Sequence, residues 1–216
     1  GPITNNAWQH IVATYDKTTV KIYISGTLDT ATAGSGGLNT SANVLTLGRF
    51  VSSDYFTGQM DEIRIYDRIL SADEISQLYR LTTPTGVDTS LKGYWSFNGQ
   101  DMVGTTAYDR SGAKNTGTLT GGPTRMLGRL GQALDFDGTD DYVSVADTAL
   151  LDFGDTDAFT LSGWFNRDTF TTDDVIIAKS NDIFDTGYMV VVDDVTDALV
   201  FIAAVDPSNF YALPST

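Results

Sequence analysis

The sequence has no cysteine and a single histidine, His10, among its 216 residues. The missing cysteines exclude a disulfide framework, a thiolate metal site and a cysteine nucleophile. One histidine, with no Gly-x-Ser-x-Gly motif, does not make a Ser–His–Asp arrangement, so we expect His10 to be a packed structural residue near Trp8. No apolar run reaches the length of a membrane-spanning helix, and we expect no membrane insertion.

Basic residues and glutamate are also scarce. Thirteen Lys and Arg residues stand against 28 Asp and Glu, for a formal net charge of −15, which makes nucleic acid a poor partner. Glu62 and Glu74 are the only glutamates. Asp favours turns and Ca²⁺-binding loops, whereas Glu favours helices. This bias, with 21 glycines, predicts many strands joined by short turns.

Alternating apolar residues predict strands along most of the chain. The expected strands cover residues 8–15, 20–24, 44–47, 56–66, 93–97, 132–136, 142–145, 159–165, 175–178, 188–192 and 198–205. Residues 29–43 are small and polar and are expected to form a loop. The capping box Ser71-Ala-Asp-Glu74 predicts one short helix ending near Arg80. Many short strands, one helix and no strand–helix alternation predict an all-β, antiparallel β-sandwich.

A polar segment with Pro and Gly, residues 81–92, is the best domain boundary. It separates residues 1–80 from residues 93–216. After it come the motifs Gly93-Tyr-Trp-Ser-Phe-Asn98, Asp109-Arg-Ser-Gly112, Gly131-Gln-Ala-Leu-Asp-Phe-Asp-Gly138 and Phe159-Thr-Leu-Ser-Gly-Trp164. Before it come Trp8-Gln-His-Ile-Val-Ala-Thr-Tyr-Asp16, Val20-Lys-Ile-Tyr-Ile24 and Gly58-Gln-Met-Asp-Glu-Ile-Arg-Ile-Tyr66.

The motifs after the boundary resemble the front half of a laminin G-like (concanavalin A-like lectin/glucanase) jelly-roll domain, and those before it resemble the back half. The resemblance implies one sandwich whose C-terminal half precedes its N-terminal half. If the last residues of the chain, Phe210–Thr216, are placed before the first, Gly1–Tyr15, the combined segment predicts a strand, a turn and a second strand. Three explanations fit this order: one period of a tandem array, a circular permutant that closes on itself, or strand exchange between chains that builds a filament. We therefore expect copies of this chain as partners.

A calcium site is expected around Asp61. This residue is in phase with Ile63 and Ile65, so we expect its carboxylate to point inward, where it must be paired or bind metal. Further oxygen ligands are expected within reach of this strand in a jelly roll: Asn98, Asp101 and Asp109. Hard oxygen ligands from separate loops suit Ca²⁺, and the resemblance implies a structural Ca²⁺ in many relatives. Alternatively, Asp61 accepts hydrogen bonds from the backbone or from Arg64.

Two further groups of aspartates lie in expected hairpin turns. The groups are Asp137, Asp140 and Asp141, and Asp193, Asp194 and Asp197. The sequence Asp-Gly-Thr-Asp-Asp is above all a good turn. A metal role for the first group is the lesser alternative, and we expect the second to be a solvated turn.

The aromatic residues divide into core and surface candidates. Trp8, Trp95 and Trp164 sit among apolar neighbours in strands and are expected to pack in the core rather than stack on sugars. Other aromatic residues occupy loop-like stretches and are candidates for an exposed recognition surface or a subunit contact: Tyr55, Phe56, Phe184 and Tyr211.

Catalysis is not expected. Glycosidase chemistry needs two poised carboxylates, and Glu62 stands outside the Glu-x-Asp-x-x-Glu pattern that related glucanases place on one strand. We expect a non-catalytic extracellular structural or adhesion module, a repeat of a larger bacterial surface protein or a filament subunit that assembles by strand complementation. The alternative is a carbohydrate-binding module. Glycans or cell-surface proteins are then the expected partners besides other copies of the chain.

Overall fold

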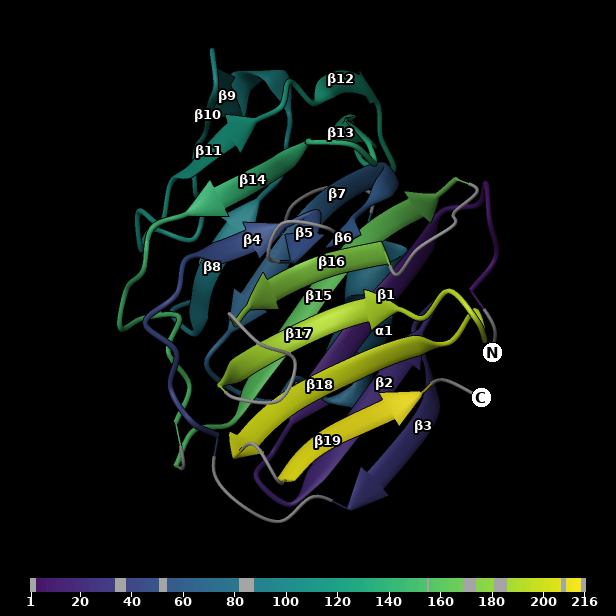
Figure 1. Cartoon of the computed structure of the whole chain (residues 1–216), viewed down its shortest axis with the longest axis vertical. Helices are drawn as coiled ribbons and strands as arrows, with labels where there is room; N and C mark the ends of the chain where they lie inside the picture. Colours follow the sequence, from purple (N-terminus) through teal and green to yellow (C-terminus); the bar gives the residue numbers. More distant parts are fainter. Residues whose placement is uncertain are drawn as a thin grey trace.

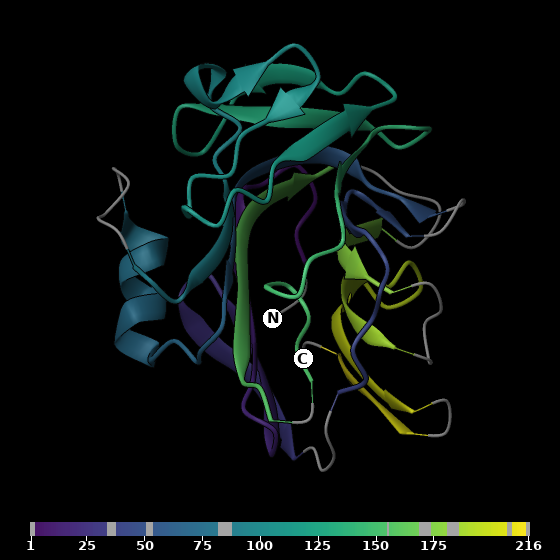
Figure 2. The same cartoon turned by 90° about the vertical axis from the view of Figure 1, so that its left-hand side faces the viewer.

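The computed structural model describes residues 3–33, 38–50, 54–81, 88–154, 156–168, 174–180, 186–206 and 209–214, with backbone only from residue 204 onward. Two large antiparallel sheets lie face to face, and one helix covers the outer side of one of them (Figure 1 and Figure 2). The expected all-β sandwich with one short helix is therefore confirmed.

The sheet beneath the helix has eight strands among the described residues. We call it the front sheet, although it lies behind the other sheet in the view of Figure 1. In spatial order they are β12 (Thr124–Leu127), β13 (Gln132–Asp137), β7 (Thr57–Tyr66), β15 (Phe159–Arg167), β1 (Gln9–Tyr15), β2 (Thr19–Ile24) and β3 (Thr27–Ala33), with β8 (Leu91–Trp95) also paired to β7. Strand β3 occupies part of the expected loop 29–43. The expectation of a loop was wrong for this part of the segment, because the small polar residues of β3 lack the apolar alternation by which a strand is predicted.

The opposite sheet, the back sheet, has nine strands within the described part of the chain. In order they are β19 (Asn209–Pro214), β18 (Leu199–Asp206), β17 (Gly187–Val192), β16 (Asp174–Lys179), β4 (Leu45–Leu47), β14 (Tyr142–Val145), β11 (Gly117–Thr120), β10 (Thr106–Ala107) and β9 (Met102–Val103). A short pair, β5 (Arg49–Phe50) and β6 (Asp54–Tyr55), and a 3₁₀ turn, η1 (Gly99–Asp101), complete the described elements.

Strand β7 lies at the centre of the front sheet. One of its edges pairs with β13 and then with β8, and its other edge pairs with β15. Strands from both sides of the expected boundary at residues 81–92 thus share one sheet within this chain. Residues 82–87 lie outside the described residues, and β8 already begins at Leu91. The division into two complementary halves stays a prediction.

The space between the sheets is filled by one apolar cluster drawn from both parts of the sequence. Ile63 on β7 and Trp95 on β8 are fully buried in it, as is Phe159 on β15. The Trp95 indole N–H donates to the carbonyl oxygen of Asn115 at 2.9 Å. Trp95 is therefore a core residue, as expected.

Helix α1 (Ala72–Arg80) begins at the expected capping box. The Glu74 backbone N–H donates to the Ser71 hydroxyl oxygen, and the Glu74 carboxylate accepts from the Ser71 backbone N–H at 2.8 Å. Ile75 anchors the helix in a second apolar cluster on the outer side of the front sheet. No helix among the described residues is long and apolar enough to span a membrane.

Candidate functional site

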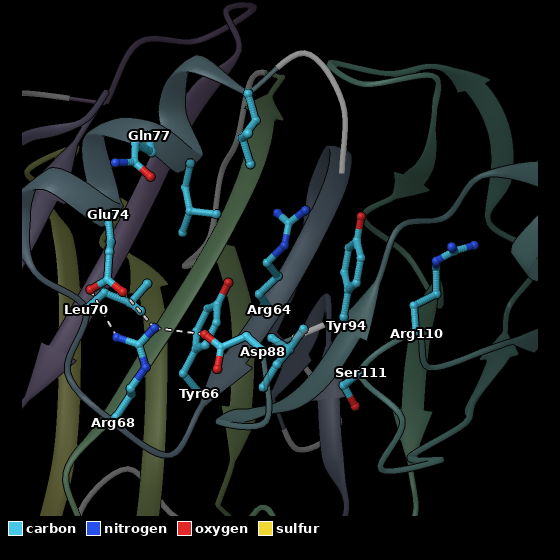
Figure 3. Close-up of a pocket in the computed structure, with 13 residues that line it drawn as sticks. Arg64, Tyr66, Arg68, Leu70, Glu74, Gln77, Asp88, Tyr94, Arg110 and Ser111 are labelled. Carbon is cyan, nitrogen blue, oxygen red and sulfur yellow. Dashed lines mark hydrogen bonds and ion pairs between the residues drawn. The ribbon is translucent and has the colours of Figure 1, made fainter. Parts of the chain in front are cut away.

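A groove of about 420 Å³ lies on the outer side of the front sheet, between α1 and strands β7 and β8 (Figure 3). Three arginines line it: Arg64, Arg68 and Arg110. Carboxyl, amide and phenol groups accompany them, and leucines from α1 and its flanks supply an apolar wall. A groove of this mixed chemistry can hold a polar ligand by several hydrogen bonds while burying part of its apolar surface.

One rim of the groove is held by Arg68. Its guanidinium donates to Glu74 at 3.0 Å and to Asp88 at 2.8 Å, and its Nε donates to the Ser90 hydroxyl. The hydrogen bond from Arg68, followed by the one from the Ser71 backbone, lowers the pKa of Glu74 to about 2. Because the paired side chains are about one third exposed, water screens them, and the pair positions the rim more than it stabilises the fold.

Arg64 and Tyr94, which line the groove, both contact the buried carboxylate of Glu62. Glu62 and Arg64 are almost completely buried and form a salt bridge. The Tyr94 hydroxyl donates to Glu62 Oε2 at 2.8 Å, and the Arg64 guanidinium carbon lies 4.2 Å from the centre of the Tyr94 ring. In the part of the chain that the structure describes, Glu62 Oε1 has no hydrogen-bond donor. The Glu62 carboxylate thus depends on Arg64 and Tyr94.

A β-bulge in β7 determines which way its acids face. Glu62 has a φ of 58°, and the register with β15 shifts at this point. Met60 and Ile63 both face the core, so the bulge puts Asp61 on the outer face, opposite Trp164 of β15. The expectation that Asp61 points inward with Ile63 was wrong, because the bulge adds one residue to the alternation.

Asp61 is nevertheless fully buried, beneath residues 128–131. Its Oδ2 accepts from the Leu130 backbone N–H at 2.8 Å, and its Oδ1 has no donor among the described residues. The backbone hydrogen bond fits the alternative interpretation of this residue. Burial raises the pKa of Asp61 to about 7, with a further contribution from the charge of Glu62.

His10 lies on the same outer face. Its Nε2 is 3.1 Å from the Ser162 hydroxyl oxygen, and its ring centre is 5.1 Å from that of Trp164. Tyr79 of α1 stacks on Trp164, with 5.5 Å between the ring centres. Burial, followed by the charges of Arg64 and Arg129, lowers the pKa of His10 to about 3. His10 is therefore a packed neutral residue, as the sequence suggested.

The other expected calcium ligands are engaged by protein donors. The Asn98 side-chain oxygen accepts from the Gln132 backbone N–H at 2.9 Å. Asp101 forms an ion pair with Arg110 and accepts from the Ser96 hydroxyl at 2.6 Å. Asp109 accepts four hydrogen bonds from Tyr94, Ser111 and Asn115, three of them from backbone N–H groups. With their oxygens occupied in this way, Asp101 and Asp109 offer little coordination to an ion.

The three aspartates of the turn between β13 and β14 do gather. Carboxylate oxygens of Asp137, Asp140 and Asp141 all lie within 4.8 Å of one another, and within the described residues this is the one group of at least three acidic, histidine or cysteine ligands that does so. Asp141 is buried, and its Oδ2 accepts from the Asp137 backbone N–H at 3.0 Å. Folds of the concanavalin A-like type often bind metals, and this cluster supplies suitable oxygens.

The expected aromatic surface is only partly described. Tyr55 is half-buried on β6. Phe56 is fully buried in the core, edge-on to Phe136 and Phe165, so the expectation that it is exposed was wrong. Phe184 lies outside the described residues, and of Tyr211 only the backbone is described.

Comparison with known protein families gives a match for the first part of the chain. Residues 1–76 match the family model of the concanavalin A-like lectin/glucanases superfamily. The sequence resemblance is thereby confirmed over this segment. Neither a curated protein nor a solved structure matched the chain. Together with the sandwich, the match fits a lectin-like or adhesion module. The reversed order of the two halves stays a prediction.

Proposed function

We propose that the chain is a non-catalytic structural or adhesion module of an extracellular surface protein. The observation that carries this proposal is the position of β7, which precedes residues 81–92 and pairs with β13 and β15, which follow them, and with β8, which begins at Leu91. A sheet connected in this way cannot separate into two parts without breaking the central ladder and exposing the shared core. A sheet with this continuity is suited to a module that has to resist mechanical force.

The state of the glutamates supports a non-catalytic role. Glu62 is held by Arg64 and Tyr94, and Glu74 by Arg68 and its own helix cap. A retaining or inverting glycosidase needs one carboxylic acid and one free carboxylate on either side of a substrate bond. Neither glutamate is placed to fill one of these roles, because each is committed to an arginine.

The assembly state tests the proposal. If the two parts complete one sandwich within a chain, multi-angle light scattering of the purified protein should give a single species with the mass of one chain, 23.3 kDa, at all concentrations tried. Long fibres in electron micrographs, or a mass that grows with concentration, would favour strand exchange between chains and contradict closure within the chain.

A lectin-like role is the second candidate, and the groove favours it. Its guanidinium, carboxylate and amide groups are the donors and acceptors that bind sugar hydroxyls. On a glycan array, binding that Gln77→Ala abolishes would support this role, because Gln77 lines the groove and is exposed. Gln100→Ala, which alters an exposed glutamine of η1 outside the groove, is the matched control. No binding to any glycan would favour the structural role.

Calcium is part of the proposal, at the turn that contains Asp137, Asp140 and Asp141. Three carboxylates at close range repel one another, and a bound Ca²⁺ would relieve this repulsion. EDTA should therefore lower the melting temperature of the protein by several degrees, and added Ca²⁺ should restore it. The double variant Asp137→Asn/Asp140→Asn should no longer respond to EDTA. An unchanged melting temperature of the unaltered protein in EDTA would count against the site.

A further inference from the structure

Lys179, the last residue of β16, is a buried cation surrounded by oxygen. Its side chain is 1 % exposed. The ammonium donates to the backbone oxygens of Ser41 at 2.7 Å and Asn43 at 2.8 Å, and to Asp147 Oδ1 at 2.7 Å. A fourth oxygen, Asp152 Oδ1, lies 2.8 Å from the same nitrogen. We call these four oxygens the Lys179 cage.

The composition of the cage is that of a cation site. An ammonium group has three N–H donors, yet four oxygens surround this one at nearly equal distance. Two are backbone carbonyls and two are carboxylates, the hard oxygen donors that Ca²⁺ takes from loops. Without a cation between them, the like charges of Asp147 and Asp152, whose side chains are 39 % and 22 % exposed, would repel each other.

Hydrogen bonds from other residues position the two loops that supply the oxygens of the cage. The Ser41 hydroxyl accepts from the backbone and side-chain N–H groups of Asn43, which fixes the turn that presents both carbonyl oxygens. On the other side, the Tyr188 hydroxyl donates to the carbonyl oxygen of Leu151 at 3.2 Å. The two loops that supply the oxygens, residues 38–44 and 146–152, are thus positioned by bonds that do not involve Lys179.

We propose that the four oxygens of the Lys179 cage are arranged as in a calcium site. In this protein the lysine ammonium occupies the position of the ion and joins the two loops without a metal. Replacing Lys179 by a small residue would then leave four preformed oxygens and two negative charges. The oxygens would need to close in by only a few tenths of an ångström to reach the distance of about 2.3–2.6 Å that Ca²⁺ prefers. Water would complete the coordination.

Two variants test this proposal by thermal unfolding with and without about 5 mM Ca²⁺. Lys179→Ala removes the ammonium and leaves space, whereas Lys179→Met removes the charge but fills the cage with its side chain. In EDTA both variants should melt about 10 °C below the unaltered protein, because each removes the buried ammonium and its charge-assisted hydrogen bonds to the two loops. Ca²⁺ should restore at least half of this loss in Lys179→Ala and much less in Lys179→Met.

The double variant Asp137→Asn/Asp140→Asn, compared with the unaltered protein, distinguishes calcium binding at the Lys179 cage from calcium binding at the turn between β13 and β14. In isothermal titration, Lys179→Ala in the double-variant background should bind one equivalent of Ca²⁺, and the background alone should bind none at the cage. If Lys179→Ala does not fold in EDTA, its refolding yield should recover when Ca²⁺ is present. The proposal is overturned if Ca²⁺ has the same effect on the alanine and methionine variants, or if neither variant is less stable than the unaltered protein.

Discussion

Asp61→Asn should make the protein more stable at pH 8 while leaving its stability at pH 4 almost unchanged. The folded protein raises the pKa of Asp61 to about 7, chiefly through burial, whereas the unfolded chain has the ordinary value of about 3.9. At a pH between these two pKa values, the Asp61 carboxyl is ionised in the unfolded chain but keeps its proton in the folded protein. The unfolded state therefore binds fewer protons, and the free energy of unfolding falls as the pH rises through this window.

The size of this effect follows from the shift in the pKa of Asp61. A difference of about three pKa units corresponds to about 4 kcal/mol, fully expressed only above pH 7. Asparagine keeps an oxygen that can accept from the Leu130 N–H but does not ionise. Urea unfolding at pH 4, 6 and 8 should therefore show a gap between the variant and the unaltered protein that grows with pH.

Asp73→Asn is the matched control, since Asp73 is an exposed acid in the first turn of α1. Its stability should follow that of the unaltered protein across the whole pH range. All samples should contain EDTA, because a Ca²⁺ ion bound to the Asp61 carboxylate would reverse the sign. An Asp61→Asn variant that is less stable than the unaltered protein at pH 8 would refute the pKa shift.

The elements that the sequence predicted well are those with a local physical signal. Alternation of apolar residues identified the long strands, including β1 and β15, and the capping box at Ser71 identified the start of α1. Strand β3 was missed because its side chains are small, polar and largely exposed, and its backbone is extended only through pairing with β2. Strands β9 to β12 are missing from the expected strands because each has only two to four residues, too few to show an alternating pattern.

The site was harder to predict because its geometry depends on backbone details. Nothing in the sequence around Glu62 signals a positive φ in a residue other than glycine, and this one bulge moves Asp61 to the other face of the sheet. Phe56 stands next to polar residues, so its burial follows from the fold and not from a pattern. Half of the Lys179 cage consists of backbone carbonyls, which residue types cannot reveal.

Arg64→Met should be among the most damaging single substitutions in the protein. Arg64 is the charged partner of Glu62, whose side chain is completely buried. Without the guanidinium, the carboxylate would keep only the hydrogen bond from the Tyr94 hydroxyl. Removing one member of a buried ion pair costs about 3–5 kcal/mol, because it leaves an uncompensated charge in a low-dielectric environment. The urea midpoint of the variant should fall accordingly, at an unchanged m-value.

The double variant Glu62→Gln/Arg64→Met separates the loss of the pair from the loss of packing. With both charges removed, no ion remains buried, and the double variant should be more stable than Arg64→Met alone even though it contains one more substitution. Tyr94→Phe, which removes only the phenol donor to Glu62, is the graded comparison and should cost about 1.5–3 kcal/mol. If the destabilisation of the double variant equals the sum of the losses measured for Glu62→Gln alone and for Arg64→Met alone, the side chains of Glu62 and Arg64 act independently. The attraction between the two buried charges would then contribute little to the stability of the protein.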